Sequence, residues 1–212
     1  MNNKIYTVVM NFMEPMIEDN HHRYKSWEHC FQYFSQDIEQ INEDVACLHL
    51  SFYLASWGMY RGSSFLLQKD YLVHKDVVQE ILKYKYLQDI DLNNILNTDK
   101  EFKDIFLLSA FIKKSFLYNH YVTDTLLTKI LLGTLGCVPA YDRYFLKILK
   151  DKKISPWTKF SEKNFFELIK LYRSEKDTFL KIQLDIQEKT NIKYPVMKLI
   201  DMYFFTLGFN KN

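Results

Sequence analysis

The chain has 212 residues, of which 48% are hydrophobic and 17% aromatic, and its formal net charge at pH 7 is only +2. This composition supports a sizeable buried core and excludes a disordered chain. Five glycines and four prolines provide few turns for short strands, so the sequence predicts an all-α protein.

The predicted elements begin with a short N-terminal arm or strand, IYTVVMNFM, which is rich in β-branched residues. A helix follows from Tyr24 to Asp37. The next, from Asp44 to Gln68, is apolar nearly all round, which places it at the centre of the core. Further helices are predicted over Tyr71 to Tyr86, Phe102 to Tyr118, Thr123 to Leu135, Tyr141 to Lys150, Ser161 to about Gln187, and Pro195 to Leu207.

These helices predict a single helical domain over residues 1–212, formed as one compact unit or as two closely packed lobes. Residues 89–100, DIDLNNILNTDK, are acidic and rich in asparagine, which makes them the candidate connector between lobes. The sequence leaves the oligomeric state open.

The sequence also sets expectations for cofactors and location. Cys30, Cys47 and Cys137 are far apart, which indicates reduced thiols rather than a disulfide framework. No CxxC or HxxxH spacing occurs, so we expect no metal and no cofactor. The apolar run from Val45 to Tyr60 contains His49 and is shorter than the roughly 20 residues of a membrane span. The opening residues do not resemble a signal peptide, and we expect a cytoplasmic protein without a membrane partner.

The most informative segment is TKILLGTLGCVPAYDRYFLKILK, from Thr128 to Lys150. An apolar helix with Thr123 as its N-cap is expected to end at Gly136, because glycine adopts left-handed dihedrals easily. Pro139 then turns the chain. Asp142 falls in the first turn of the next helix, where the helix dipole favours a carboxylate. Capping is therefore the simplest interpretation of Asp142.

The segment LGCVPAYDRYF resembles part of the helix-hairpin-helix DNA glycosylase superfamily, in which a helix and short turn lead to a Pro-Val-Asp-like motif. The resemblance implies a compact helical glycosylase-like fold with Asp142 as the catalytic residue. It also implies a double-stranded DNA partner that carries a damaged or modified base, in repair or in anti-phage defence. The hairpin signature Leu-Pro-Gly-x-Gly is absent, because FLYNHYVTDTLLTK stands in its place. Bifunctional members carry a hairpin lysine, but Lys129 falls a turn too late, so we expect a monofunctional enzyme that uses water.

A second parallel is the segment YLASWGMYRGSSFLLQ, which occupies the place of an early family helix that approaches the flipped base. It makes Trp57, Tyr60 and Arg61, together with Tyr141, candidates for binding the substrate. A basic cluster directly follows Asp142. Its candidate phosphate contacts are Arg143, Lys147, Lys150, Lys152 and Lys153. A solvated helix face explains the same lysines equally well.

Two alternatives come from other functional classes. Arg23 to His29, RYKSWEH, fits the Arg-x(4–6)-His pattern of HEPN-type RNases, in which Arg binds the scissile phosphate and His transfers a proton. The other alternative is a non-enzymatic interaction module, because aromatic residues recur at helical spacing on one helix. They are Tyr24, Trp27, Phe31 and Phe34, and core packing is the simpler explanation for them.

Overall fold

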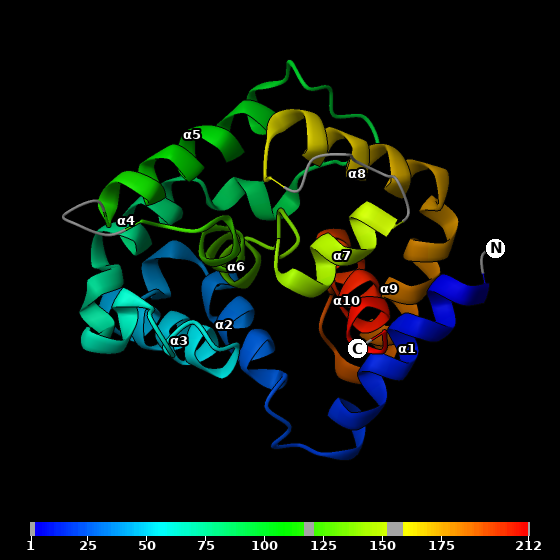
Figure 1. Cartoon of the computed structure of the whole chain (residues 1–212), viewed down its shortest axis with the longest axis horizontal. Helices are drawn as coiled ribbons and strands as arrows, with labels where there is room; N and C mark the ends of the chain where they lie inside the picture. The colour runs from blue at the N-terminus through cyan, green and yellow to red at the C-terminus, as the bar shows by residue number, and fades with distance from the viewer. Residues whose placement is uncertain (1–2, 117–120, 152–158, 212) are drawn as a thin grey trace.

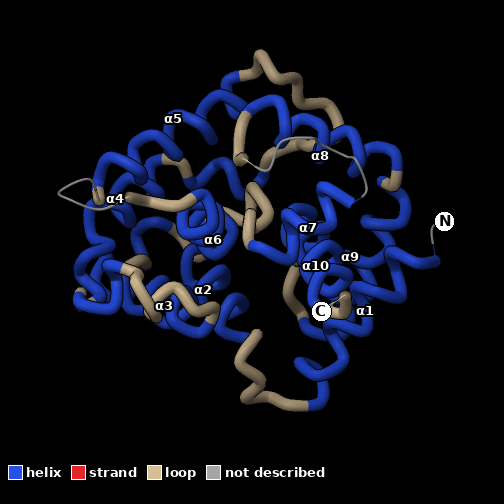
Figure 2. Tube along the Cα trace, viewed as in Figure 1, coloured by secondary structure: helices blue, strands red, loops and turns tan. Residues whose placement is uncertain are grey.

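The structure is a computed structural model that describes residues 3–116, 121–151 and 159–211. These residues form α-helices and short 3-10 helices with no strand, as predicted (Figure 2). The short helices are η1 (Ile38–Gln40), η2 (Phe65–Gln68), η3 (Tyr71–His74) and η4 (Lys85–Asp89). Within the described ranges, no helix combines the length and the hydropathy that a membrane crossing requires.

The helices pack as two groups, which we call lobe 1 and lobe 2 (Figure 1). Lobe 1 consists of α2 (Lys25–Ser35), α3 (Glu43–Ser56), α4 (Lys75–Lys83), α5 (Lys100–Ser115) and α6 (Asp124–Thr134). Lobe 2 consists of α1 (Asn3–Glu18), α7 (Arg143–Asp151), α8 (Glu162–Ser174), α9 (Lys176–Thr190) and α10 (Val196–Phe209). In lobe 2 the N-terminal helix α1 packs directly on the C-terminal helices α9 and α10.

The chain passes between the lobes at two loops, residues 19–24 after α1 and residues 135–142 after α6 (Figure 2). The predicted connector at residues 89–100 lies elsewhere. It joins η4 to α5, and both of these pack in lobe 1 with α4. Within it, Asp91 accepts hydrogen bonds from the backbone and side-chain N–H groups of Asn93 and from the side chain of Asn94. The amide oxygen of Asn93 also accepts the Tyr172 hydroxyl of α8, so the segment contacts lobe 2 without being a chain passage to it.

The predicted N-terminal arm or strand is wrong, because this segment forms α1. Its buried side chains, Ile5, Val9, Met13 and Met16, recur at spacings of three and four and therefore lie on one helix face. That face packs on α9 and α10. Burial of an amphipathic face outweighs the weak strand preference of β-branched residues.

The predicted helix from Asp44 to Gln68 is also wrong in its length and place. It ends at Ser56, since Gly58 adopts a left-handed φ of 77° and starts a turn. Leu48 and Phe52 are exposed, so α3 lies at the surface rather than at the centre. The most enclosed helix is α6, in which every residue from Leu126 to Thr134 is buried.

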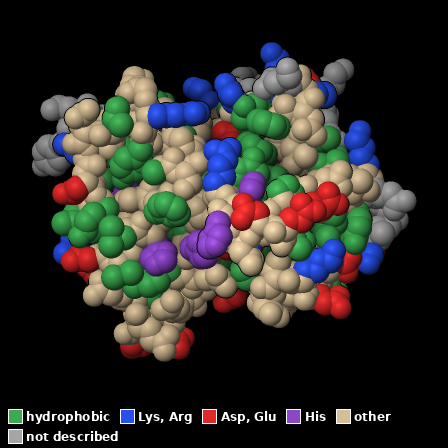
Figure 3. Space-filling view, turned by 90° about the horizontal axis from the view of Figure 1, so that it is seen from below, with side chains coloured by type: hydrophobic (Ala, Val, Ile, Leu, Met, Phe, Trp, Pro, Cys, Tyr) green, Lys and Arg blue, Asp and Glu red, His purple; other side chains and the backbone are tan. Residues whose placement is uncertain are grey.

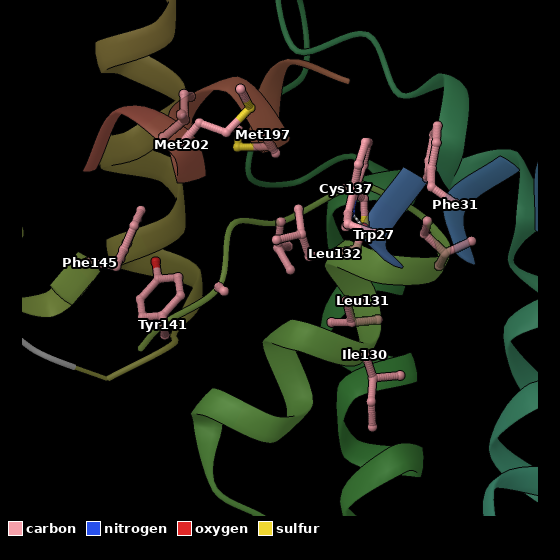
Figure 4. Packing of buried hydrophobic residues seen from close by; sticks show 14 of the residues in the cluster. Trp27, Phe31, Ile130, Leu131, Leu132, Cys137, Tyr141, Phe145, Met197 and Met202 are labelled. Carbon is pink, nitrogen blue, oxygen red and sulfur yellow. Dashed lines mark hydrogen bonds between the residues drawn. The ribbon is translucent and has the colours of Figure 1, made fainter. Parts of the chain in front are cut away.

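The core continues from α6 into the loop that follows it. Trp27 of α2 donates its indole N–H to the carbonyl of Leu132 at 2.9 Å, and Cys137 lies beside them (Figure 4). Tyr141 packs against Phe145 at the start of α7, with ring centroids 5.1 Å apart. This core fixes the position of the loop between the lobes.

The aromatic residues proposed as an interaction stripe belong largely to this core. Trp27, Phe31 and Phe34 are buried, and Tyr24 is half-buried with its ring stacked on Trp57. The three cysteines are buried free thiols, as their sequence separation indicated. Burial raises the pKa of the Cys47 thiol to about 11, which suits a packing role rather than a nucleophile.

Candidate active site

A cavity of about 510 Å³ lies where the two lobes meet. Lobe 1 contributes the end of α3 and two residues of α6, and lobe 2 contributes the start of α7 and the end of α10. The lining residues are Arg23, Ala55, Ser56, Trp57, Gly58, Met59, Arg61, Thr125, Lys129, Asp142, Arg143, Tyr144, Phe205 and Phe209. Asp142, which the sequence singled out, is the only carboxylate among them.

The two carboxylate oxygens of Asp142 have different surroundings. Oδ1 accepts the backbone N–H groups of Tyr144 and Phe145, each at 3.0 Å, so Asp142 caps α7 as expected. Oδ2 lies 3.5 Å from Nζ of Lys129. The Asp142 side chain is 13% exposed and that of Lys129 is 4% exposed. The capping bonds therefore hold one oxygen in place, and the other faces an ammonium group in a largely desolvated site.

Lys129 lies beside Asp142, although its register in the sequence falls a turn later than that of the hairpin lysine in bifunctional family members. The loop after α6 turns back along that helix instead of leading away from it. Gly136, with φ 62°, reverses the chain, and the loop then advances about 3.3 Å per residue compared with 1.5 Å per residue in α6. A loop of only a few residues therefore spans more than one turn of α6 and brings Asp142 beside Lys129.

Three hydrogen bonds fix the end of this loop. The Tyr141 backbone N–H donates to Oγ1 of Thr128 at 2.8 Å, and Oγ1 of Thr125 donates to the Tyr141 carbonyl at 2.8 Å. The Ala140 N–H donates to Oδ1 of Asp201 at 3.0 Å. Side chains from both lobes therefore position the two residues that precede Asp142.

A second ion pair lies buried behind the cavity. Nζ of Lys198 is 3.1 Å from Oδ2 of Asp201, three residues later on α10. Burial lowers the pKa of Lys198 and raises that of Asp201, because desolvation penalises both charged forms. Lys129 and Lys198 both approach the Trp57 ring, at 4.9 and 5.2 Å from its centroid. Two cations thus lie at one indole ring, and each of them is paired with a carboxylate.

Aromatic rings form one wall of the cavity. Trp57 stacks on Tyr24 at 4.8 Å between ring centroids, and Tyr24 stacks on Phe12 at 4.9 Å. Phe205 meets Trp57 edge to face at 5.7 Å. The indole Nε1 of Trp57 is buried and has no hydrogen-bond partner among the described residues.

The structure brings three of the predicted site residues to Asp142 and places two others elsewhere. Trp57, Arg61 and Arg143 line the cavity, but Tyr60 and Tyr141 do not. The correction for Tyr60 follows from the turn after α3: its hydroxyl donates to Ser51 and lies 2.8 Å from Nε2 of His74.

Tyr141 is fully buried and packs against Phe145 and Phe160. Its apolar surroundings account for its position better than a binding role does. Its hydroxyl has no partner among the described residues.

The basic cluster after Asp142 is not gathered at the cavity. Lys147 donates to the carbonyl of Lys211, and Lys150 is exposed near the far end of α7, about 12 Å along the helix from Asp142. Lys152 and Lys153 lie outside the described residues. Of the members of this cluster that the structure describes, only Arg143 lines the cavity.

Sequence reasoning missed Lys129, Lys198, Asp201 and Arg23 as members or supports of this site. A usable signal was present for three of them, because charged residues interrupt the apolar runs LLTKILLG and PVMKLIDMYFF. Charged groups inside such helices are usually paired. Arg23 has no comparable signal, since it lies in a polar loop.

A smaller hollow of about 310 Å³ lies nearby, lined by Arg23, His29, His21, His22 and other residues. Figure 3 shows histidine side chains gathered on this face of the molecule, with hydrophobic side chains around them. Arg23 and His29 of the RNase-like pattern therefore share one concave surface. Among the described residues, no three side chains of His, Cys, Asp or Glu are grouped as metal ligands.

The comparisons with known proteins leave the site to be interpreted on its own geometry. No protein-family model, no curated protein and no solved structure matches the chain.

Proposed function

We propose that the protein hydrolyses the N-glycosidic bond of a flipped, damaged or modified base in double-stranded DNA, with Asp142 as the catalytic carboxylate. The observation that carries the proposal is the placement of Asp142, which is held by its helix cap in a cavity between two lobes and largely shielded from water. The cavity volume of about 510 Å³ is in the range of small-molecule sites. Its aromatic wall suits the face of a base.

The chemistry requires a fixed negative charge. As the base departs with the electrons of the C1′–N bond, positive charge develops on the sugar. A carboxylate held in a site of low water content stabilises that charge and accepts a proton from the attacking water.

The experiment measures release of free base from damaged and from bacteriophage-modified DNA, with abasic sites scored by alkaline cleavage. We expect Asp142→Asn to abolish release, because asparagine keeps the cap but removes the charge. Asp151→Asn is the matched control. Asp151 lies at the other end of α7, in an exposed ion pair with Lys211, and its loss should leave the rate unchanged. Release that persists in folded Asp142→Asn, or is absent from every substrate, contradicts the proposal.

Lys129 supports a bifunctional enzyme as a second candidate, since its Nζ lies beside Asp142 in the same cavity. After transferring a proton to Asp142, the amine would attack C1′ and displace the base. The C1′–O4′ bond would then break and open the sugar ring, and the Schiff base formed in this way would permit elimination of the 3′ phosphate. Borohydride reduces such an intermediate to a covalent protein–DNA adduct. An adduct that forms with the native chain and disappears in Lys129→Gln supports this candidate, and base release without an adduct supports the monofunctional enzyme.

The RNase alternative has one supporting observation, the common hollow of Arg23 and His29. An imidazole near a guanidinium can transfer protons to a phosphodiester that the guanidinium binds. RNA cleavage that is lost in His29→Gln but kept in Asp142→Asn would favour this alternative over base excision.

A further inference from the structure

Arginine is distributed very unevenly in this protein. The sequence has four arginines and 24 lysines. Three of the four arginines line the cavity that contains Asp142, whereas Lys129 is the only described lysine that lines it. The fourth, Arg173, has a structural role, because its guanidinium donates to the backbone carbonyls of Leu92 and Ile95.

The three cavity arginines come from separate parts of the chain. Arg23 lies in the first loop between the lobes, Arg61 follows the turn at the end of α3, and Arg143 is the first residue of α7. All three are exposed. They converge at one cavity only because the lobes pack against each other there.

None of these arginines is used in an ion pair within the described parts of the chain. Arg23 lies over the Tyr24 ring at 5.1 Å and Arg143 over the Tyr144 ring at 4.5 Å. Arg143 also donates one N–H of Nη2 to the Tyr144 hydroxyl. Stacking uses the face of a guanidinium and leaves the rest of its N–H edge free to donate.

The charge of the cavity is strongly one-sided. Its cations are the three arginines and Lys129, and its only carboxylate, Asp142, is already paired with Lys129. The lining therefore carries a net charge of +3, although the whole chain carries only +2. An anion is the natural partner of such a surface. Arginine favours planar, bidentate contact with phosphate oxygens, which lysine cannot make.

We propose that Arg23, Arg61 and Arg143 form a phosphate clamp, which binds the DNA phosphates on either side of the nucleotide that enters the cavity. The clamp rests on the proposed function, and it adds the contacts that hold the strand while the base lies against the aromatic wall. It places DNA binding at the cavity rim instead of along the lysines of α7. The sequence already predicted that Arg143 contacts phosphate. The clamp adds Arg61 from lobe 1 and Arg23 from the loop of residues 19–24.

Binding to a DNA that cannot react tests the clamp separately from catalysis. The ligand is a short duplex with one uncharged abasic-site analogue, and its affinity for the full chain is measured over a range of salt concentrations. We expect Arg23→Gln, Arg61→Gln and Arg143→Gln each to weaken binding about tenfold and to reduce the salt slope by about one. Arginine-to-lysine variants should keep the slope but lose affinity. Lys189→Gln, an exposed change on α9, is the matched control and should bind like the native chain.

A second ligand locates the contacts. Neutral methylphosphonates replace the phosphates that flank the abasic analogue. They should weaken binding by the native chain but not by the triple glutamine variant. Native-like affinity and salt slope in all three single variants, or an equal methylphosphonate effect in the triple variant, would overturn the clamp. Arginine-dependent binding without base release from any substrate would refute the proposed function and leave the clamp standing. Base release together with binding that does not depend on the arginines would refute the clamp and leave the proposed function standing.

Discussion

The hydroxyl of Thr128 provides a test of how the loop holds Asp142. Its Oγ1 accepts the Tyr141 N–H at 2.8 Å and donates to the carbonyl of Asp124, four residues earlier in α6. Thr128 is fully buried. The change Thr128→Val keeps the shape of the side chain and removes the acceptor, which leaves the Tyr141 N–H without its partner.

The structure sets the size of the effect. An unsatisfied buried N–H costs about 1–3 kcal/mol, and we expect Thr128→Val to lower the free energy of unfolding by that amount. The carbonyl of Asp124 contributes little to this, because the helix already supplies it with a donor. Thr128→Ser keeps the hydroxyl and deletes one methyl group, which costs about 1 kcal/mol. The two variants thus separate the hydrogen bond from the packing.

The proposed base release should respond more strongly than stability to the loss of this hydroxyl. Tyr141 directly precedes Asp142, and a displacement of about 1 Å at a catalytic group can lower the rate about 100-fold. We expect such a loss in Thr128→Val and a nearly native rate in Thr128→Ser. Urea unfolding gives the stability, and single-turnover base release gives the rate.

Thr134→Val is the control for Thr128→Val. Thr134 is buried in the same helix, but its hydroxyl donates only to the carbonyl of Ile130 one turn earlier. Its removal should change stability little, because such a bond adds little to a helix. If Thr128→Val matched the native chain in both stability and rate, the hydroxyl would not be what positions the loop.

Three further predictions concern buried residues of the fold. Gly208→Ala should lower stability by about 1–3 kcal/mol, because the new methyl would lie 2.3 Å from the backbone oxygen of Tyr144. This clash should outweigh the better helix propensity of alanine, and a rise in the urea midpoint would contradict the prediction. Burial lowers the pKa of His74 to about 4, below the value near 6.5 in an unfolded chain. The unfolded chain therefore binds the proton more tightly, so stability should fall by about 3 kcal/mol between neutral pH and pH 4, and His74→Gln should lose this dependence in urea titrations. Lys198→Met should cost about 3–5 kcal/mol, since it leaves the Asp201 carboxylate buried without its cation. Adding Asp201→Asn should recover part of the lost free energy of unfolding. A double variant that is less stable than Lys198→Met alone would show that the two residues do not interact favourably.

The sequence predicted α6, its turn and the start of α7 well because each boundary has a local cause. Thr123 accepts the N–H of Leu126 as the N-cap, and Gly136 adopts the left-handed conformation expected after a helix end. The capping role of Asp142 follows from the same kind of local signal.

Other boundaries were not predicted because their causes are distant in sequence. The predicted helix from Ser161 to about Gln187 is two helices, which separate at Glu175 without a glycine or proline. Similarly, the contact between Lys129 and Asp142 depends on the path of the loop, which anchors from both lobes determine. Periodicity identifies a face to bury, but it does not say how far a loop returns along its own helix.

The packing of α1 on α9 and α10 has a consequence for how the protein acquires its site during synthesis. Helix α1 is made before α10, which begins only at Val196, so at ordinary translation rates α1 waits on the order of ten seconds for this partner. Lobe 1 is continuous in the chain and can fold on the ribosome during that time. Phe205 and Phe209 join the cavity only when the last helix docks. A nascent chain that has made lobe 1 but not yet α10 therefore has an incomplete cavity.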